Sequence, residues 1–147
     1  MNKNSEVQVE ITNFQHTDTM DPLDMDILRT KALGRLTQKK EALFLVYKER
    51  DAESGEITRN IITFRKGQMR LHKSGQICWE AEFEVGRSYA AVYQTPYGNY
   101  PMRVHTLELE VVEEDHQMLV RLHYLLDQGQ QEEVDCKMEI LLKEGLL

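Results

Sequence analysis

Apolar and polar residues alternate with a period of two along most of this chain. The alternation is clearest in residues 117–127 and 131–143. The first segment has apolar residues at Met118, Val120, Leu122, Tyr124 and Leu126, and the second at Val134, Cys136, Met138, Ile140 and Leu142. Such a period places every second side chain on one face of a β-strand, whereas a helix requires a period of about 3.6. The two segments, with a turn over 127–130, predict an antiparallel hairpin with one buried face.

The same alternation predicts strands over most of the remaining chain. Residues 77–85 and 89–93 form a second predicted hairpin around Gly86. Shorter strands are expected at 6–14, 41–49, 56–64 and 68–73. Residues 22–33 differ, because Asp21 and Pro22 begin a pattern typical of a helix start, with an N-cap residue, a proline and acidic residues in the first turn. Local propensity alone therefore predicts a helix there.

The segment 100–112 changes the parity of its alternation. Its apolar residues include Met102, Val104, Leu107 and Leu109. A β-bulge near His105 and Thr106 would turn all four inward and leave Arg103 and Glu108 outside. Burial of the two leucines contributes about 1.5 to 3 kcal/mol each. This exceeds the roughly 1 kcal/mol lost when a bulge disrupts the hydrogen bonding of one position in the strand ladder. The sequence therefore predicts a bulge.

About eight to ten short strands without a long helix favour an all-β fold, an antiparallel up-and-down meander closed into a barrel, because closure removes exposed strand edges. A two-sheet sandwich is the alternative. With 147 residues and no linker or repeat, the chain is expected to form a single β-barrel domain over residues 1–147. The interior of such a barrel is either filled by side chains or holds one small ligand.

Composition limits the partners that are expected. The chain has 25 acidic and 18 basic residues and a formal net charge of -7, so neither nucleic acid nor an anionic membrane is an expected partner. No segment approaches the roughly 18 apolar residues of a membrane helix, and the first residues contain no apolar signal region, so a cytoplasmic location is expected. Cys78 and Cys136 are too few for a disulfide framework and are expected to be reduced thiols.

Several motifs resemble those of a known family. They are Thr95-Pro96-Tyr97-Gly98, the strand Met102 to Thr106, and Leu122-His123-Tyr124, with weaker similarity upstream from about Ile27. In these the chain resembles the YwiB-like family, small bacterial proteins of unknown function with a calycin or lipocalin-like barrel. The resemblance implies that much of 22–33 is a strand, and it implies no reaction. The family tends to have an arginine where this chain has Lys73, and a lysine does not reproduce the bidentate fork with which arginine binds planar anions.

No residue pattern predicts a catalytic centre, a metal site or a cofactor. The histidines lack the spacing of a helical metal motif, and the motifs GxSxG, GxGxxG and HExxH are absent. His105 and His123 fall on adjacent predicted strands and, with Arg103, form the enzymatic alternative. Because each histidine flanks inward residues, alternation favours the outer face for both. A noncatalytic protein is therefore preferred.

Aromatic residues form the candidate ligand site. They are Trp79, Tyr89, Tyr93, Tyr97 and Tyr124. Tyr97 belongs to the motif at 95–98, which is predicted to be a turn and, as the alternative, a loop at the barrel mouth. Inward aromatic residues commonly fill a core, but several inward tyrosines need hydrogen-bond partners and so favour a partly polar interior.

The first functional hypothesis is a barrel that binds a small, partly apolar molecule. The alternative is a protein interaction module or homodimer without such a ligand. It is motivated by Leu146, Leu147 and the apolar residues on both faces of 43–47, because a strand that is apolar on both sides needs a second covering surface.

Overall fold

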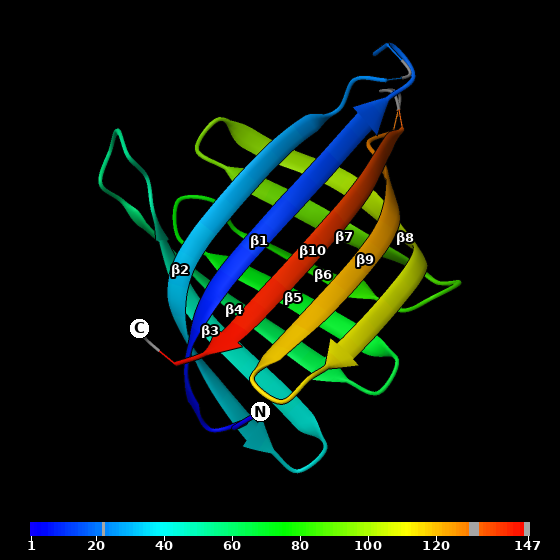
Figure 1. Cartoon of the computed structure of the whole chain (residues 1–147). Coiled ribbons are helices and arrows are strands. Elements are labelled where there is room, and N and C mark those ends of the chain that lie inside the picture. Colours follow the sequence, from blue (N-terminus) through cyan, green and yellow to red (C-terminus); the bar gives the residue numbers. More distant parts are fainter. Residues whose placement is uncertain (22, 130–132, 146–147) are drawn as a thin grey trace.

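The computed structural model describes residues 1–21, 23–129 and 133–145, and these ranges contain ten β-strands and no helix (Figure 1). The strands are β1 (Ser5–Thr17), β2 (Asp26–Lys39), β3 (Ala42–Arg50), β4 (Ile57–Arg65), β5 (Gln68–Ser74), β6 (Trp79–Phe83), β7 (Ser88–Thr95), β8 (Gly98–Glu113), β9 (Gln117–Asp127) and β10 (Val134–Glu144). All pairings are antiparallel. The predicted all-β class is confirmed. No helix in the described ranges is long and apolar enough to span a membrane.

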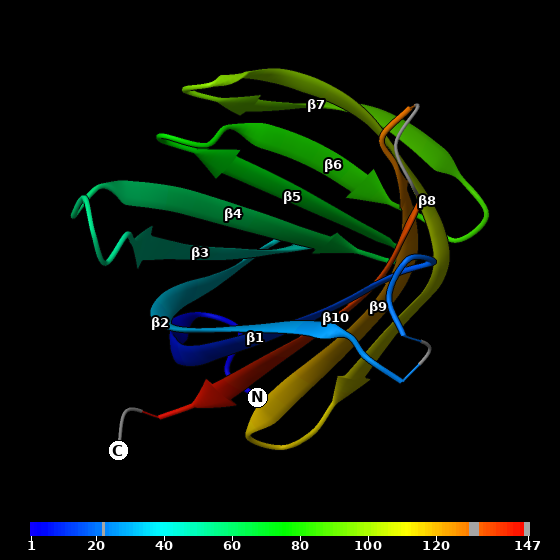
Figure 2. The same cartoon turned by 90° about the horizontal axis from the view of Figure 1, so that it is seen from above.

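The strands form one sheet that curls into a nearly closed barrel. Their order is β6-β5-β4-β3-β2-β1-β10-β9-β8-β7, so consecutive strands are neighbours in the sheet except β6 and β7, while β1 and β10 are neighbours without being consecutive. The first strand pairs with the last over eleven positions, from Val7 with Glu144 to Thr17 with Val134. The sheet therefore ends at β6 and β7, which face each other where the barrel meets itself (Figure 2). We call this line the seam.

The predicted hairpin of residues 77–85 with 89–93 is wrong. In the described residues β6 and β7 form no ladder, and one bridge between Cys78 and Gln94 joins them, with N to O distances of 2.9 and 2.8 Å. The connecting turn bonds to β8 instead, since the Gly86 amide donates to the Thr106 carbonyl at 2.9 Å. Each strand is thereby held by its other neighbour, β6 by β5 and β7 by β8.

The alternation correctly predicted the inner face of the barrel. All ten apolar positions named for β9 and β10 are buried, and they pack with inward residues of the other strands. Gly34 on β2 allows this packing, because a Cβ there would lie 2.8 Å from Val9 Cγ2 and 3.0 Å from Leu45 Cδ1. The core thus needs a glycine for close approach of the neighbouring strands.

Residues 26–39 form β2, so the helix predicted from local propensity is wrong over 26–33. Pro22 lies outside the described residues. β2 pairs with β1 over eleven positions, from Gln15 with Asp26 to Ser5 with Leu36. The preference of this segment for a helix amounts to a few tenths of a kcal/mol per residue. The backbone hydrogen bonds to β1 and the burial of Leu36 outweigh it.

β8 contains the predicted bulge, but it lies one residue later than expected. The register shifts between Thr106, which faces Tyr124, and Glu108, which faces His123. Arg103 and Glu108 are exposed, Val104 is buried, and Met102 and Leu109 pack against the core, as predicted. Leu107 was predicted to face inward and is 37% exposed, whereas Thr106 is 1% exposed. The extra residue of the bulge is therefore Leu107, and Thr106 takes the inward position.

Candidate functional site

The barrel interior contains a cavity of about 410 Å³ that opens at one end. Its apolar wall comes mainly from β5, β8, β9 and β10, through Leu71, Met102, Tyr124, Leu126 and Met138. Trp79 and Tyr93 line it from the two sides of the seam, and Asn13, Gln15, Asp26, Lys73 and Gln128 supply polar groups. A hollow of about 70 Å³ adjoins this cavity and shares Asn13, Leu28, Leu71, Lys73 and Met138 with it. The interior therefore has both an apolar wall and a polar part.

Three polar residues on successive strands form that polar part. Glu49 lies on β3, Asn60 on β4 and Lys73 on β5, and Asn60 pairs directly with Lys73 across the ladder. Each shares the inward parity of buried neighbours, since Leu45 and Tyr47 precede Glu49, and Ile62 and Leu71 flank the others. We call Glu49, Asn60 and Lys73 the polar triad.

The triad is joined through one carboxylate oxygen. The Lys73 ammonium donates to Glu49 Oε1 at 2.9 Å, and the Asn60 amide Nδ2 donates to the same oxygen at 2.8 Å. About a quarter of the Lys73 side chain and a third of that of Glu49 are exposed, at 25% and 31%. A pair in this setting contributes little to stability, because the solvent screens it. Its placement on the inner wall calls for another explanation.

Asn60 is the most enclosed member of the triad. Its exposed fraction is 0%, and its side-chain oxygen Oδ1 has no hydrogen-bond partner among the described residues. A buried amide oxygen without a partner costs about 1 to 3 kcal/mol. Asn60 lines neither the cavity nor the adjoining hollow, so protein atoms enclose this acceptor.

Two tyrosines extend the polar part. Burial, followed by the nearby Glu49 carboxylate, raises the pKa of Tyr47 and that of Tyr93 above the ordinary value of 10.0. Both hydroxyls therefore stay protonated at neutral pH, and neither bonds to another described residue. On β10, burial raises the pKa of the Cys136 thiol to about 11, so this cysteine is a neutral part of the core.

The structure brings three of the five predicted aromatic residues to the cavity. Trp79 and Tyr93 meet edge to face with ring centroids 5.9 Å apart, and Tyr124 packs on Phe83 at 5.0 Å. Tyr89 is half-buried against the core and does not line the cavity. Tyr97 is 93% exposed in the β7–β8 turn. Their role in binding stays a prediction.

The motif at 95–98 forms the predicted turn. The Thr95 hydroxyl donates to the Gly98 carbonyl at 3.0 Å and accepts from the Tyr97 amide at 3.1 Å. Gly98 has a φ of 143°, which a residue with a Cβ rarely adopts. The turn is thus explained by its local hydrogen bonds.

The polar triad was missed by the sequence analysis, although a signal was present. Alternation marks an inner face by its apolar residues, and a polar residue at the same parity carries no such mark. Continuing the parity of Leu43, Leu45 and Tyr47 by two residues would have placed Glu49 inside. Lys73 differs from the family pattern, and its parity with Leu71 is the signal that places it inside.

The histidines considered for catalysis lie on the outer face. His105 contacts the Ser88 hydroxyl at 2.9 Å, and His123 contacts Asp135 at 2.7 Å. Arg103 is exposed on the same face as His105. No group of three or more His, Cys, Asp or Glu side chains in the described part of the chain is placed to hold a metal ion.

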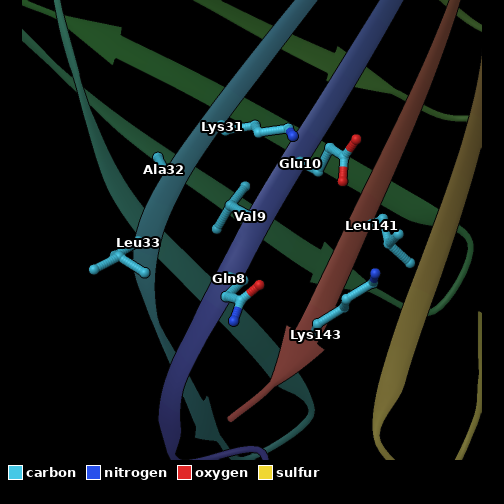
Figure 3. A pocket seen from close by; sticks show the side chains of 8 residues that line it. All are labelled: Gln8, Val9, Glu10, Lys31, Ala32, Leu33, Leu141 and Lys143. Atoms are coloured by element: carbon cyan, nitrogen blue, oxygen red, sulfur yellow. The ribbon is translucent and has the colours of Figure 1, made fainter. Parts of the chain in front are cut away.

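Another hollow, of about 480 Å³, lies outside the barrel across β2, β1 and β10 (Figure 3). Its lining includes Glu10, Lys31 and Lys143 together with Leu33 and Leu141, and no aromatic side chain. Because Glu10 faces Lys31 directly in the ladder, this groove is a charged outer surface. The interior cavity is the better candidate for a ligand site.

Comparisons with known proteins agree with the fold. A crystal structure of the ywiB protein from Bacillus subtilis matches with a TM-score of 0.82 and 16% sequence identity, over 99% of this chain and 96% of that one. At this identity the match shows the fold alone. No curated protein matches the chain. A family model described as a domain of unknown function, DUF1934, matches residues 9–140. The chain therefore belongs to the DUF1934 family, as its resemblance to YwiB-like proteins indicated.

Proposed function

We propose that the barrel interior binds a small, partly apolar molecule. The observation that carries the proposal is an open interior cavity of about 410 Å³ with Lys73 on its wall, bonded to Glu49, which lines the adjoining hollow. The volume lies within the roughly 300 to 1,000 Å³ of small-molecule sites, which are mostly apolar and contain a few polar groups that orient the ligand.

The distribution of polar residues supports this proposal. The other end of the barrel is closed by fully buried apolar side chains such as Val7, Leu36 and Leu142. A barrel stabilised only by its core has no need of a carboxylate, an amide and an ammonium on its inner wall, since burial of polar groups is costly. Inward polar residues beside a cavity are typical of recognition.

The proposal is tested with a neutral fluorophore, N-phenylnaphthylamine, that is excited directly. We expect saturable binding with one molecule per chain. Leu28→Trp enlarges a side chain that lines the cavity at its rim and should weaken binding at least about tenfold, which corresponds to about 1.4 kcal/mol. Leu33→Trp is the matched control, because Leu33 lies on the outer groove of the same strand with a similar exposure, 68% against 65%.

Two results would refute the proposal. One is unchanged binding of the fluorophore by Leu28→Trp, which would place the probe outside the cavity. The other is the absence of binding by the unaltered protein, together with native mass spectra of protein from its own host that contain no additional mass. Trp79 is the only tryptophan of the chain and lines the cavity, so a change in its emission gives a second measure of ligand entry.

The homodimer alternative stays a prediction. Leu146 and Leu147, on which it partly depends, lie outside the described residues. On β3, Leu43, Leu45 and Tyr47 face the interior, while Phe44 and Val46 are half-buried on the outer face. Sedimentation at micromolar concentration would test it, and a strict monomer would exclude a stable dimer.

A further inference from the structure

We infer that the interior site takes an uncharged amphiphile whose polar end both donates and accepts hydrogen bonds, as a primary amide does. This inference rests on the proposed function and adds the chemical class of the ligand. It follows from the balance of charge in the polar triad and from the donors and acceptors that the triad leaves available.

The charges of the triad cancel. Glu49 and Lys73 form an ion pair at 2.9 Å, so the wall that a ligand meets has one charge of each sign. An anionic ligand that bonds to Lys73 would approach the Glu49 carboxylate, and Asp26 at the rim of the cavity adds a further negative charge. A cationic ligand that bonds to Glu49 would approach the Lys73 ammonium. In each case the ligand would lie close to a like charge and be repelled by it. An uncharged group is repelled by neither Glu49 nor Lys73.

The triad nevertheless offers hydrogen bonds of both kinds. The Lys73 ammonium has three donors, of which Glu49 accepts one, so donors remain for a carbonyl oxygen. The Glu49 carboxylate lines the adjoining hollow and accepts from Lys73 and Asn60 at Oε1, so its other oxygen is left to accept from an N–H or O–H group. The protonated hydroxyls of Tyr47 and Tyr93 can both donate and accept a hydrogen bond. A primary amide, with one acceptor and two donors, satisfies such a surface.

The remaining wall suits a hydrocarbon body. Leu71, Met102, Leu126 and Met138 line the cavity with flexible or branched apolar side chains, and Trp79 adds an aromatic surface. Methionine adapts its shape to different apolar partners, which favours chains over one rigid ring system. The ligand is therefore expected to place its polar end at the triad and its apolar part along these residues.

The test uses three molecules that share one hydrocarbon chain, decanamide, decanoate and decylammonium, below their aggregation limits. Each is titrated against bound N-phenylnaphthylamine on the full chain at neutral pH. We expect decanamide to displace the fluorophore at a concentration about tenfold lower than either charged molecule. Equal or better displacement by decanoate or decylammonium would overturn the inference, as would bound fluorophore that none of the three displaces. A failure of the fluorophore itself to bind would instead count against the proposed function.

Two substitutions convert the neutral site into a charged one. Glu49→Gln leaves Lys73 without its partner and should shift the preference toward decanoate by about tenfold. Lys73→Met leaves Glu49 without its partner and should shift it toward decylammonium by a similar factor. The double variant Glu49→Gln with Lys73→Met restores neutrality, and it should again prefer decanamide to both charged molecules.

The matched controls make the same charge changes outside the barrel. Glu10→Gln and Lys31→Met alter a carboxylate and an ammonium that face each other on the outer groove. They should leave the ratio of the three affinities unchanged. Equal shifts in the outer and inner variants would show that net charge of the protein sets the preference, and this would overturn the inference. Should an inner variant not fold, the ratio measured on the unaltered protein still decides the question.

Discussion

Gly34 shows how a single residue limits the shape of this barrel. It faces inward on β2, between Val7 of β1 and Tyr47 of β3, and it is buried. The Cβ of any other residue would lie 2.8 Å from a methyl group of Val9 and 3.1 Å from the Val46 carbonyl oxygen. The carbonyl belongs to the backbone of the adjacent strand, so it cannot move aside as a flexible side chain does.

We therefore predict that Gly34→Ala destabilises the protein by about 1 to 3 kcal/mol, the range for an extra methyl group in a packed core. The free energy of unfolding in urea measures the effect. Arg35→Ala serves as the control, because Arg35 is exposed on the next position of the same strand and its removal should change stability by less than about 0.5 kcal/mol. A Gly34→Ala protein as stable as the unaltered one would mean that β2 and β3 can separate freely.

At the scale of single residues, the sequence was sufficient to predict which apolar side chains face the barrel interior, but not which polar side chains do. Alternation placed Tyr124 and Trp79 correctly because each shares the parity of other apolar residues on its strand, Leu122 and Leu126 for Tyr124, and Ala81 and Phe83 for Trp79. It did not lead to Glu49 or Asn60, because a polar residue at an inward position carries no hydrophobic signal. Only the ladder between β4 and β5 brings Asn60 beside Lys73, and pairing of this kind is not contained in the pattern of one strand.

At the scale of the element, the alternation of apolar residues predicts that β8 contains a bulge, but it does not predict which residue is the extra one. Apolar parity requires one extra residue between Val104 and Leu109, and several placements satisfy that requirement. The structure inserts Leu107, because the Thr106 backbone bonds to the β6–β7 turn through Gly86 and Arg87, at 2.9 and 3.2 Å. These long-range bonds hold Thr106 inward and leave Leu107 outside.

The position of the bulge predicts opposite effects for two leucines. Leu107→Glu should reduce the free energy of unfolding by less than about 1 kcal/mol, since the side chain already faces outward. Leu109→Glu should cost more than about 2 kcal/mol, because it places a carboxylate against the core. Denaturant titrations of the two variants measure the difference. Equal losses would indicate that both leucines face the core, as the sequence alone suggested.

The same reasoning explains the failure at residues 26–33. The local pattern around Asp21 and Pro22 is typical of a helix start, and nothing within the segment reveals that β1 provides eleven paired positions for it. Long-range pairing decides between helix and strand when the local preference is weak. The resemblance to YwiB-like proteins contained that information, and the local pattern did not.

At the scale of the whole molecule, the barrel is asymmetric in how its strands are held. β1 pairs over eleven positions with each of its neighbours, whereas β6 pairs with β5 over five positions and has one bridge toward β7. The seam follows from this difference. Alternation identifies the inner face of each strand but not its partner, which is why 77–93 was predicted to be a hairpin.

The seam is therefore expected to be the first part of the barrel to open. Local opening has a low free energy where few backbone bonds and few buried contacts must be broken, and amide hydrogens exchange through such openings. Amides of β6 and β7 should exchange at least about tenfold faster than those of β1 and β10 at neutral pH, as measured by mass spectrometry of peptides from the labelled protein.

Because Trp79 and Tyr93 lie on the two sides of the seam and both line the cavity, a bound amphiphile should slow exchange in β6 and β7 more than in β1. Uniform exchange across all four strands would show that the barrel opens only as one unit, and the seam would then have no separate role in ligand entry.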